Sequence, residues 1–328
     1  MSKPRLLITR RVFPEVVDAL RAVYEVRTND DDAFWTPEQT REKAADCDAL
    51  YVVATDRVDA ALLAACPNLK IVATGSVGYN QIDVAACTAR GIPVTNTPDV
   101  LTEATADMAW ALLMATARRV TESERWLREG KWGRWAWDQF LGADVHGATL
   151  GIVGMGRIGS AVARRASGFS MRLQYTNRSP APNEAELGAL RVDLDTLLAT
   201  SDHVVLVLPY SPQTQHMIGA AQLARMKPGA TLVNIARGGI VDDAALARAL
   251  RDGPLAAAGL DVFEGEPVVN PALLEVPNVV LTPHIGSATR SSRLAMAMLA
   301  ARNLLAFAAG EPLHTPVNGD ALRARGAS

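Results

Sequence analysis

Short apolar runs rich in β-branched residues alternate with segments of helical period along most of this 328-residue chain. The expected strands of the first third are LLITR, YEVRT, ALYVV, KIVAT and IPVTNT. Parallel strands need long crossover connections, and helices usually supply them. The alternation therefore predicts a parallel sheet covered by helices. Thr36 followed by Pro37 matches the N-cap and first position of one such helix.

A second series of the same kind follows a long helical stretch, TEATADMAWALLMATARRVTESERWLREG, which Thr102 could cap. Its expected strands are TLGIVG, RLQYTN, HVVLVL, ATLVNIA, AAGLDV and NVVLTPH, and six is the number in a complete dinucleotide-binding sheet. A last Ala-rich helical segment after His284 has no strand partner of its own, so we expect it to return to the first domain. The predicted fold class is α/β with two doubly wound parallel-sheet domains. Residues 102–288 are expected to form a Rossmann cofactor domain, and residues 1–101 with 289–328 a discontinuous, flavodoxin-like substrate domain.

Composition excludes several classes of partner. Hydrophobic residues make up 49% and charged residues 21%, and the formal net charge of −2 comes without a block of like charges. A nucleic acid or an anionic membrane therefore has no electrostatic footprint here. The start, MSKPRLLITRRVFPEV, lacks the apolar core of a signal peptide. Cys47, Cys66 and Cys87 form no CxxC pair, so we expect buried thiols in a reduced cytoplasm and no metal site.

The segment GIVGMGRIG places Gly154, Gly156 and Gly159 between an apolar strand and a helix. The first glycine permits a tight turn, the second lets a pyrophosphate approach the backbone, and the third lets helix and strand pack closely. The helix N-terminus attracts the phosphates. The alternative is a tight strand-to-helix turn that binds nothing. We predict a dinucleotide site.

The ribose end of this site carries an unexpected set of residues. About 20 residues after the glycine turn, an acid usually holds the ribose 2′-hydroxyl of NAD. This chain has Asn177, Arg178 and Ser179 there instead. An arginine can pair with a 2′-phosphate that an acid would repel. The alternative is a solvated loop arginine; we predict NADPH as the preferred cofactor, with NAD as the second candidate.

Polar residues follow three strands of the second series. Arg237 comes after LVNIA, Asp261 ends AAGLDV with Glu266 close behind, and His284 follows NVVLTP. Taken singly, these are a capping arginine, a loop acid and a hydrogen-bonded histidine. Together, at the strand ends where open α/β sheets bind ligands, they favour acid–base chemistry on a carbonyl substrate.

Four segments, GIVGMGRIG, NIARGGIVDDAAL, AAGLDVFEGEP and TPHIGSAT, carry a family resemblance. The chain resembles the D-2-hydroxyacid dehydrogenase family over nearly its full length. The segment SVGYN, the stretch LTEATADMAWALLMATARR and Arg178 are similar to its glyoxylate/hydroxypyruvate reductase branch, some of whose members also reduce 2-ketogluconate. The chain departs from many relatives in GMG for GLG and in Asn80 for Asp.

The resemblance implies a role for each polar residue of the site. His284 would be the general acid, and Glu266 would hold its imidazole and favour the charged form. Arg237 would bind the substrate carboxylate and keto oxygen, helped by the backbone N–H groups of Val77 and Gly78. Asp261 would hydrogen-bond the nicotinamide carboxamide. The implied cofactor contacts are Thr105, Gly154, Met155, Gly156, Arg157, Ile158, Gly159, Asn177, Arg178, Ser179, Leu208, Pro209, Ile235, Ala236, Asp261, His284 and Gly286.

Two further expectations concern assembly and alternative functions. Members of this family are usually dimers joined through their cofactor domains, so we expect a homodimer. Trp132, Trp135 and Trp137 would pack at a domain or subunit boundary, or reach a neighbouring active site and limit substrate size. The alternatives to a ketoacid reductase are a cofactor-sensing scaffold of the same fold and a phosphite dehydrogenase-like enzyme.

Overall fold

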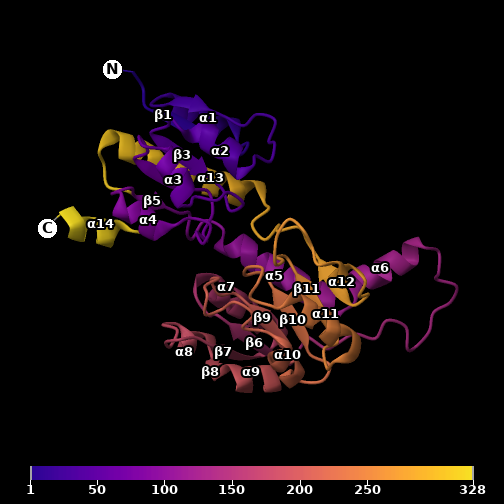
Figure 1. The fold of residues 1–328 in the computed structure, drawn as a ribbon. Helices are drawn as coiled ribbons and strands as arrows, with labels where there is room; N and C mark the ends of the chain where they lie inside the picture. The colour runs from indigo at the N-terminus through magenta and orange to yellow at the C-terminus, as the bar shows by residue number, and fades with distance from the viewer. Residues whose placement is uncertain (1, 327–328) are drawn as a thin grey trace. The chain divides into compact units, whose positions relative to one another are not determined.

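The computed structural model describes residues 2–326, and the chain divides into two units. Unit 1 combines residues Met1–Leu101 with Thr289–Ser328, and unit 2 is Thr102–Ala288. Each unit is a parallel sheet with helices on its faces (Figure 1). The predicted class, two α/β domains with parallel sheets, is confirmed. Within the described residues no helix has the length and apolar character needed to cross a membrane.

Unit 1 contains a five-stranded sheet in the order β2-β1-β3-β4-β5, with every neighbouring pair parallel. Its strands are β1 (Arg5–Ile8), β2 (Glu25–Arg27), β3 (Ala49–Val52), β4 (Ile71–Thr74) and β5 (Val94–Thr95). All residues of β3 and β4 are buried, as expected for central strands covered on both faces. The order is that of flavodoxin-like sheets.

The helices of unit 1 include two from the far end of the chain. They are α1 (Pro14–Arg21), α2 (Pro37–Ala44), α3 (Ala60–Ala65), α4 (Val84–Ala89), α13 (Arg290–Ala309) and α14 (Gly319–Gly326). Thr36 does cap α2, in a reciprocal capping box with Gln39. Helix α13 packs against α1, β3 and β4, and its Leu304 is fully buried beside Leu6 and Ile71. The last long helix is therefore part of the core of unit 1.

Unit 2 contains a seven-stranded parallel sheet in the order β12-β11-β10-β9-β6-β7-β8. Its strands are β6 (Thr149–Val153), β7 (Arg172–Thr176), β8 (Ala189–Arg191), β9 (His203–Leu206), β10 (Thr231–Asn234), β11 (Ala257–Leu260) and β12 (Val279–Leu281). The sequence predicts six of them and misses the edge strand β8. That strand has three residues and its Leu190 is exposed, so it carries no hydrophobic pattern to detect.

The helices of unit 2 differ from the expectation at one place. They are α5 (Thr102–Ala117), α6 (Val120–Arg128), α7 (Arg157–Ala166), α8 (Glu184–Leu187), α9 (Leu194–Thr200), α10 (Ala220–Arg225), α11 (Asp243–Asp252) and α12 (Pro271–Leu274), with a 3₁₀ turn at Ser167–Phe169. The single helix expected after Thr102 is broken at Arg119, whose φ is +52°. The Ala117 carbonyl there accepts a hydrogen bond from Ala143 N. Gly142 lies against this carbonyl, where a Cβ would approach within 2.3 Å.

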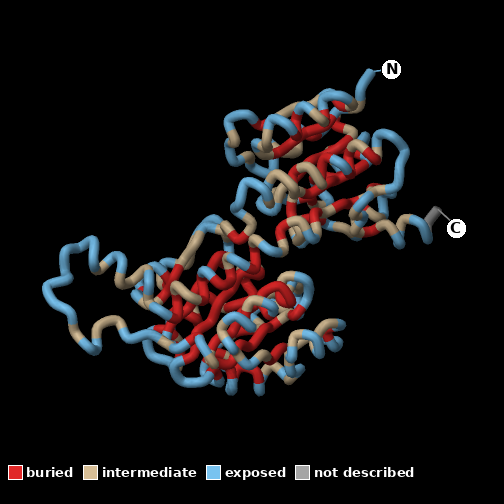
Figure 2. The backbone as a smooth tube through the Cα atoms, turned by 180° about the vertical axis from the view of Figure 1, so that it is seen from behind, coloured by how far each residue is buried: buried red, intermediate tan, exposed pale blue. Residues whose placement is uncertain are grey.

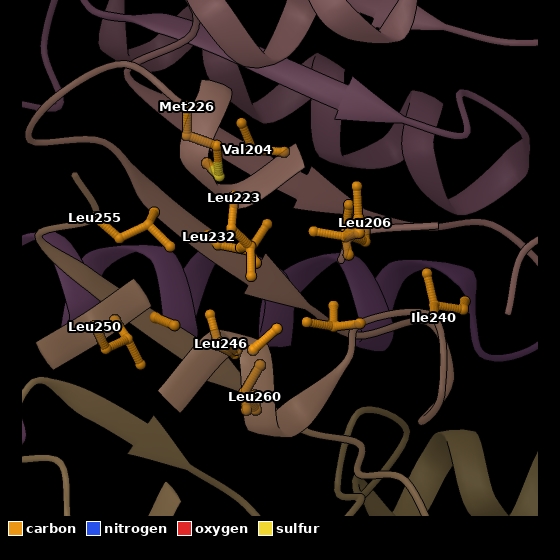
Figure 3. Close-up of a cluster of buried hydrophobic side chains, with 14 of the residues drawn as sticks. Val204, Leu206, Leu223, Met226, Leu232, Ile240, Leu246, Leu250, Leu255 and Leu260 are labelled. Atoms are coloured by element: carbon orange, nitrogen blue, oxygen red, sulfur yellow. The ribbon is translucent and has the colours of Figure 1, made fainter. Parts of the chain in front are cut away.

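Hydrophobic clusters fill both faces of the unit 2 sheet. On one face, Leu232 and Leu260 of the sheet meet Leu246 of α11 and Leu223 of α10 (Figure 3). On the other face, α5 and α7 pack against the same sheet. These buried layers are closely packed and hold the strands rigidly. The loops at the carboxyl ends of the strands are therefore anchored on a rigid sheet.

Candidate active site

Three candidate catalytic side chains lie in loops at one edge of the unit 2 sheet. Arg237 follows β10, Glu266 follows β11, and His284 follows β12. Strand β11 lies between β10 and β12, and all three run parallel. Their carboxyl ends therefore open on the same edge, where ligands of such sheets bind.

His284 and Glu266 form a direct pair. The His284 Nδ1 lies 2.7 Å from Glu266 Oε2, and Glu266 Oε1 accepts a hydrogen bond of 2.8 Å from Phe263 N. Burial alone would raise the pKa of Glu266, but its hydrogen bond to His284 and the charge of that ring lower it overall. The carboxylate is thus ionised and holds Nδ1. This leaves Nε2 as the ring nitrogen that can exchange a proton with a substrate.

Asp261 shapes the loop that carries His284. Its buried carboxylate accepts hydrogen bonds from Thr282 Oγ1 (2.6 Å), Ile285 N (2.8 Å) and Gly286 N (2.7 Å). The backbone N–H of His284 donates to the Asp261 carbonyl at 2.9 Å, although the φ of His284 is +52°. The sequence suggests Asp261 as a cofactor contact, whereas in the structure both of its carboxylate oxygens hold the histidine loop.

Arg237 is a half-buried cation. Burial lowers the pKa of its guanidinium and the charge of Glu266 raises it. Its Nη1 donates to the Ala236 carbonyl at 2.8 Å. No carboxylate oxygen among residues 2–326 lies within 4.0 Å of its nitrogens. A guanidinium held at a ligand-binding edge without an ion pair is suited to bind a carboxylate.

The sequence misses two residues that support the Glu266 loop. Asp243, the first residue of α11, accepts a hydrogen bond of 3.1 Å from Glu264 N, and His216 Nε2 lies 3.0 Å from the Glu264 carboxylate. Gly238 packs on Phe263 so closely that a Cβ would lie 1.7 Å from its carbonyl oxygen. The paired acids in GGIVDD are the only local signal for Asp243, and they resemble an ordinary helix start.

The glycine turn has the geometry that a pyrophosphate requires. Gly154 has a φ of +100°, which favours glycine, and a Cβ on Gly159 would lie 2.3 Å from the Gly154 carbonyl oxygen. Gly156 faces open space, with no atom within 4 Å of the position its Cβ would take. Helix α7 begins immediately afterwards, and its N-terminus attracts anions. The backbone therefore fits the phosphates of a dinucleotide.

The ribose end of this site is only partly as expected. Asn177 Oδ1 accepts from Met155 N at 2.7 Å, and its Nδ2 donates to the Met155 carbonyl at 3.1 Å. The Asn177 side chain, one of the expected cofactor contacts, thus braces the glycine turn. Arg178 and Ser179 follow on the exposed loop after β7.

The remaining expected cofactor contacts lie at the same edge of unit 2. Thr105 is buried on α5, and its methyl group lies 3.6 Å from the position a Cβ on Gly286 would take. The segments that directly follow β9 and β10 contain the other residues, Leu208, Pro209, Ile235 and Ala236. The structure therefore brings them together with Asp261 and the glycine turn on one sheet edge.

Val77 and Gly78 belong to unit 1, in the loop after β4. Asn96 Nδ2 donates to the Val77 carbonyl at 2.8 Å, and Ser76 Oγ donates to the Gly78 carbonyl at 2.7 Å. Both carbonyls of the loop are thus held by side chains. Asn80, the departure from relatives, is exposed beside this loop.

A projecting segment of unit 2, here called the arm, comprises α6 and residues 129–141. Helix α6 has no buried residue, and the segment after it extends away from the rest of its unit (Figure 1) and is largely exposed (Figure 2). Trp132, Trp135 and Trp137 are 58%, 63% and 86% exposed. Trp135 and Trp137 contact each other edge to face, with centroids 4.7 Å apart. The arm therefore presents apolar rings to solvent within this chain.

Comparisons with known proteins agree with this geometry. Residues 110–286 match the family model described as D-isomer specific 2-hydroxyacid dehydrogenase, NAD binding domain. A glyoxylate reductase from Thermococcus onnurineus is 51% identical over 98% of both chains. An NADPH-dependent glyoxylate/hydroxypyruvate reductase from Sinorhizobium meliloti, solved with NADP and malonate, is 38% identical with a TM-score of 0.85, over 96% of this chain and 97% of that one. A D-lactate dehydrogenase from Aquifex aeolicus, solved with NAD and lactic acid, is 28% identical with a TM-score of 0.82, over 93% and 96%.

The fold, the glycine turn and these matches define an oxidoreductase that uses NAD(P). The chain belongs to the D-isomer specific 2-hydroxyacid dehydrogenase family. Its chemistry is accordingly the exchange of a hydride between a nicotinamide cofactor and a 2-hydroxyacid or 2-ketoacid.

The buried Asp243 generates a prediction about stability and pH. Burial raises its pKa from 3.8 to about 6, so the folded protein disfavours the charged carboxylate. Relative to an Asp243→Asn variant, wild-type stability should therefore be highest below about pH 4 and fall as the pH rises to about 6. At pH 8 the variant should be more stable by on the order of 2–3 kcal/mol. Urea unfolding of both proteins at pH 4 and pH 8 measures this, and an equal difference at both pH values would contradict it.

Proposed function

We propose that this protein reduces small 2-ketoacids to D-2-hydroxyacids, with NADPH as the preferred hydride donor. The candidate substrates are glyoxylate, hydroxypyruvate and 2-ketogluconate. The observation that carries the proposal is the Arg237 guanidinium, which has no carboxylate of residues 2–326 within 4.0 Å, at the same sheet edge as the His284–Glu266 pair. This combination provides one cation for a carboxylate and one proton donor for a ketone. The glyoxylate reductases among the relatives support the substrate class.

Each residue has a distinct task in the proposed reaction. Arg237 binds the carboxylate and orients the keto oxygen. The bound nicotinamide supplies the hydride to the carbonyl carbon. His284 transfers its Nε2 proton to the keto oxygen as that oxygen gains negative charge. The Glu266 carboxylate holds Nδ1 throughout, which orients the ring.

The cofactor preference rests on Arg178. Its side chain is exposed on the loop where the ribose of a dinucleotide lies in this fold, and no acid occupies that loop. The guanidinium can form a charge-assisted hydrogen bond with a 2′-phosphate, which NADH lacks. The S. meliloti relative, solved with NADP, supports the same assignment.

We also propose a homodimer in which the arm is the interface. The arm exposes three tryptophans together with Leu127 and Leu141, and exposed apolar clusters of this kind usually mark contact surfaces. Tryptophan is also enriched among the residues that contribute most to binding between proteins. A second copy of the chain would cover these rings, and one of them would then be able to reach the partner's substrate.

Replacing His284 by Ala should lower kcat for ketoacid reduction by roughly 10²–10⁴-fold, the usual contribution of a positioned proton donor. The affinity for NADPH should change little, because the cofactor is held mainly by other residues. Since the reaction consumes a proton from His284, wild-type reduction should slow as the pH rises, and oxidation should accelerate. Glu266→Gln should also lower kcat, because the carboxylate that orients the imidazole through Nδ1 is lost. Steady-state kinetics against pH test this, and near-normal turnover by His284→Ala would show that another group is the acid.

Replacing Arg178 by Ala should weaken NADPH binding and leave NADH binding nearly unchanged. A hydrogen bond to a charged group contributes about 1.5–3 kcal/mol, so the loss should be roughly ten- to a hundred-fold. The NADPH affinity of the wild type should also fall more steeply with salt than its NADH affinity. Fluorescence titration with each cofactor measures both effects. Equal losses for the two cofactors, or a wild type that prefers NADH, would refute the assignment.

Replacing Trp137 by Ser should weaken self-association of the chain. Truncating a tryptophan at the centre of an interface costs at least about 2 kcal/mol, which is roughly thirty-fold in the dissociation constant. Phe34→Ser, which removes a 65% exposed ring from unit 1, is the matched control and should leave association unchanged. Sedimentation velocity over a concentration series measures this, and a monomeric wild type would exclude the arm as a dimer interface.

A further inference from the structure

A second arginine holds the main chain of the loop that carries Arg178. Arg191 is the last residue of β8, and its Nη2 donates to two carbonyl oxygens, that of Asn177 at 3.0 Å and that of Arg178 at 2.9 Å. Strand β8 lies along β7, with Arg191 in register with Tyr175 (Figure 1). One side chain on the edge strand thus fixes two consecutive peptide units of the loop.

The rest of the loop is anchored at both ends. At its start, the Asn177 side chain is hydrogen-bonded to both backbone groups of Met155. At its far end, Ala181 N donates to the Tyr175 hydroxyl at 2.9 Å, and that hydroxyl also contacts the Glu184 carboxylate. The side chains of Arg178 and Ser179 lie between these anchors and are exposed. The backbone is therefore held rigidly just where Arg178 projects from it.

The charges of this region point to a doubly negative ligand. Arg191 contacts the main chain of Arg178, and no carboxylate oxygen in the described part of the chain is within 4.0 Å of either guanidinium. Glu184, the acid of the adjoining helix α8, contacts the Tyr175 hydroxyl instead. Two arginines on one loop without a carboxylate partner can attract an anionic ligand. A phosphate monoester supplies that charge together with several strong acceptor oxygens.

We propose that Arg191 is a positioning residue for cofactor specificity, which holds the Asn177 and Arg178 peptides so that the Arg178 guanidinium meets the ribose 2′-phosphate. This inference rests on the proposed preference for NADPH. It extends that proposal to a residue on a different strand, 13 positions further along the chain. Arg191 acts on the phosphate through Arg178, and it does not act on the nicotinamide or the substrate.

The test is a double-mutant cycle on cofactor binding. Dissociation constants of NADPH and NADH are measured for the wild type, Arg191→Ala, Arg178→Ala and the double variant. Arg172→Ala is the matched control, because Arg172 is an exposed arginine at the other end of β7 whose guanidinium donates to Thr149 Oγ1. Like Arg191→Ala, Arg172→Ala removes one positive charge from this sheet, but it does so away from the loop that carries Arg178. NADH binding reports in each variant that the cofactor unit is folded.

We expect Arg191→Ala to weaken NADPH by about three- to ten-fold, the scale of one net hydrogen bond, with NADH binding unchanged. Because Arg191 acts through Arg178, the double variant should bind NADPH about as weakly as Arg178→Ala alone. Arg191→Lys, which keeps a donor and the charge but not the planar guanidinium, should retain part of the affinity. Arg172→Ala should resemble the wild type.

Several outcomes would overturn the inference. Equal losses of NADPH and NADH in Arg191→Ala would mean that Arg191 only supports the fold. Strictly additive losses in the double variant would make Arg191 an independent charge and not a positioning residue. If Arg178→Ala weakens NADPH but Arg191→Ala does not, the inference fails while the NADPH proposal stands. If Arg178→Ala does not discriminate between the cofactors, the NADPH proposal itself fails.

Discussion

Parallel pairing of β10, β11 and β12 is the constraint on which the candidate site depends. It directs three successive strand ends to one edge, so that Arg237 and His284, which are 47 positions apart in the chain, lie in loops at the same edge of the sheet. Strand pairing does not by itself fix the conformation of those loops. The Asp261 carboxylate converts the last of them into a defined turn, because three donors of residues 282–286 converge on its two oxygens. A buried carboxylate with this many hydrogen bonds is well compensated for its loss of solvation.

Glu266 and Asp243, two acids near the site, differ in how far hydrogen bonds and neighbouring charges offset the cost of burying them. Glu266 has a hydrogen-bond partner in His284 and a backbone donor in Phe263, and its pKa is lowered despite burial. Asp243 has one backbone donor, lies near Glu264 and Asp242, and has a pKa of about 6. The first arrangement keeps a negative charge beside His284, the proposed proton donor. The buried Asp243 carboxylate lowers the stability of the folded protein, but it holds the Glu264 peptide in place. Local costs in stability of this kind are common at functional sites.

At the cofactor site, one segment is shaped by its own residues and another by residues elsewhere in the chain. The conformation of the glycine turn depends on its own residues, since Gly154 and Gly159 pack against each other without side chains. The loop after β7 takes its shape from residues elsewhere, namely Met155 in the turn and Arg191 on the edge strand. The phosphate-binding turn is therefore a property of a short segment. The shape of the loop that carries Arg178 is a property of three segments together.

The sequence by itself determined the two α/β units, most of their strands, the glycine turn and the identity of the candidate polar residues. These depend on short-range rules: apolar periodicity, helix caps and the conformational freedom of glycine. Only the tertiary structure decided that the helix after Thr102 breaks at Arg119, that β8 extends the sheet, that Asn177 braces the glycine turn, and that Asp243 and Arg191 support functional loops. Each of these depends on a hydrogen bond or a close contact between residues that are distant in the chain. No local pattern records which carbonyl a distant guanidinium or carboxylate will face, because that is settled when the sheet assembles.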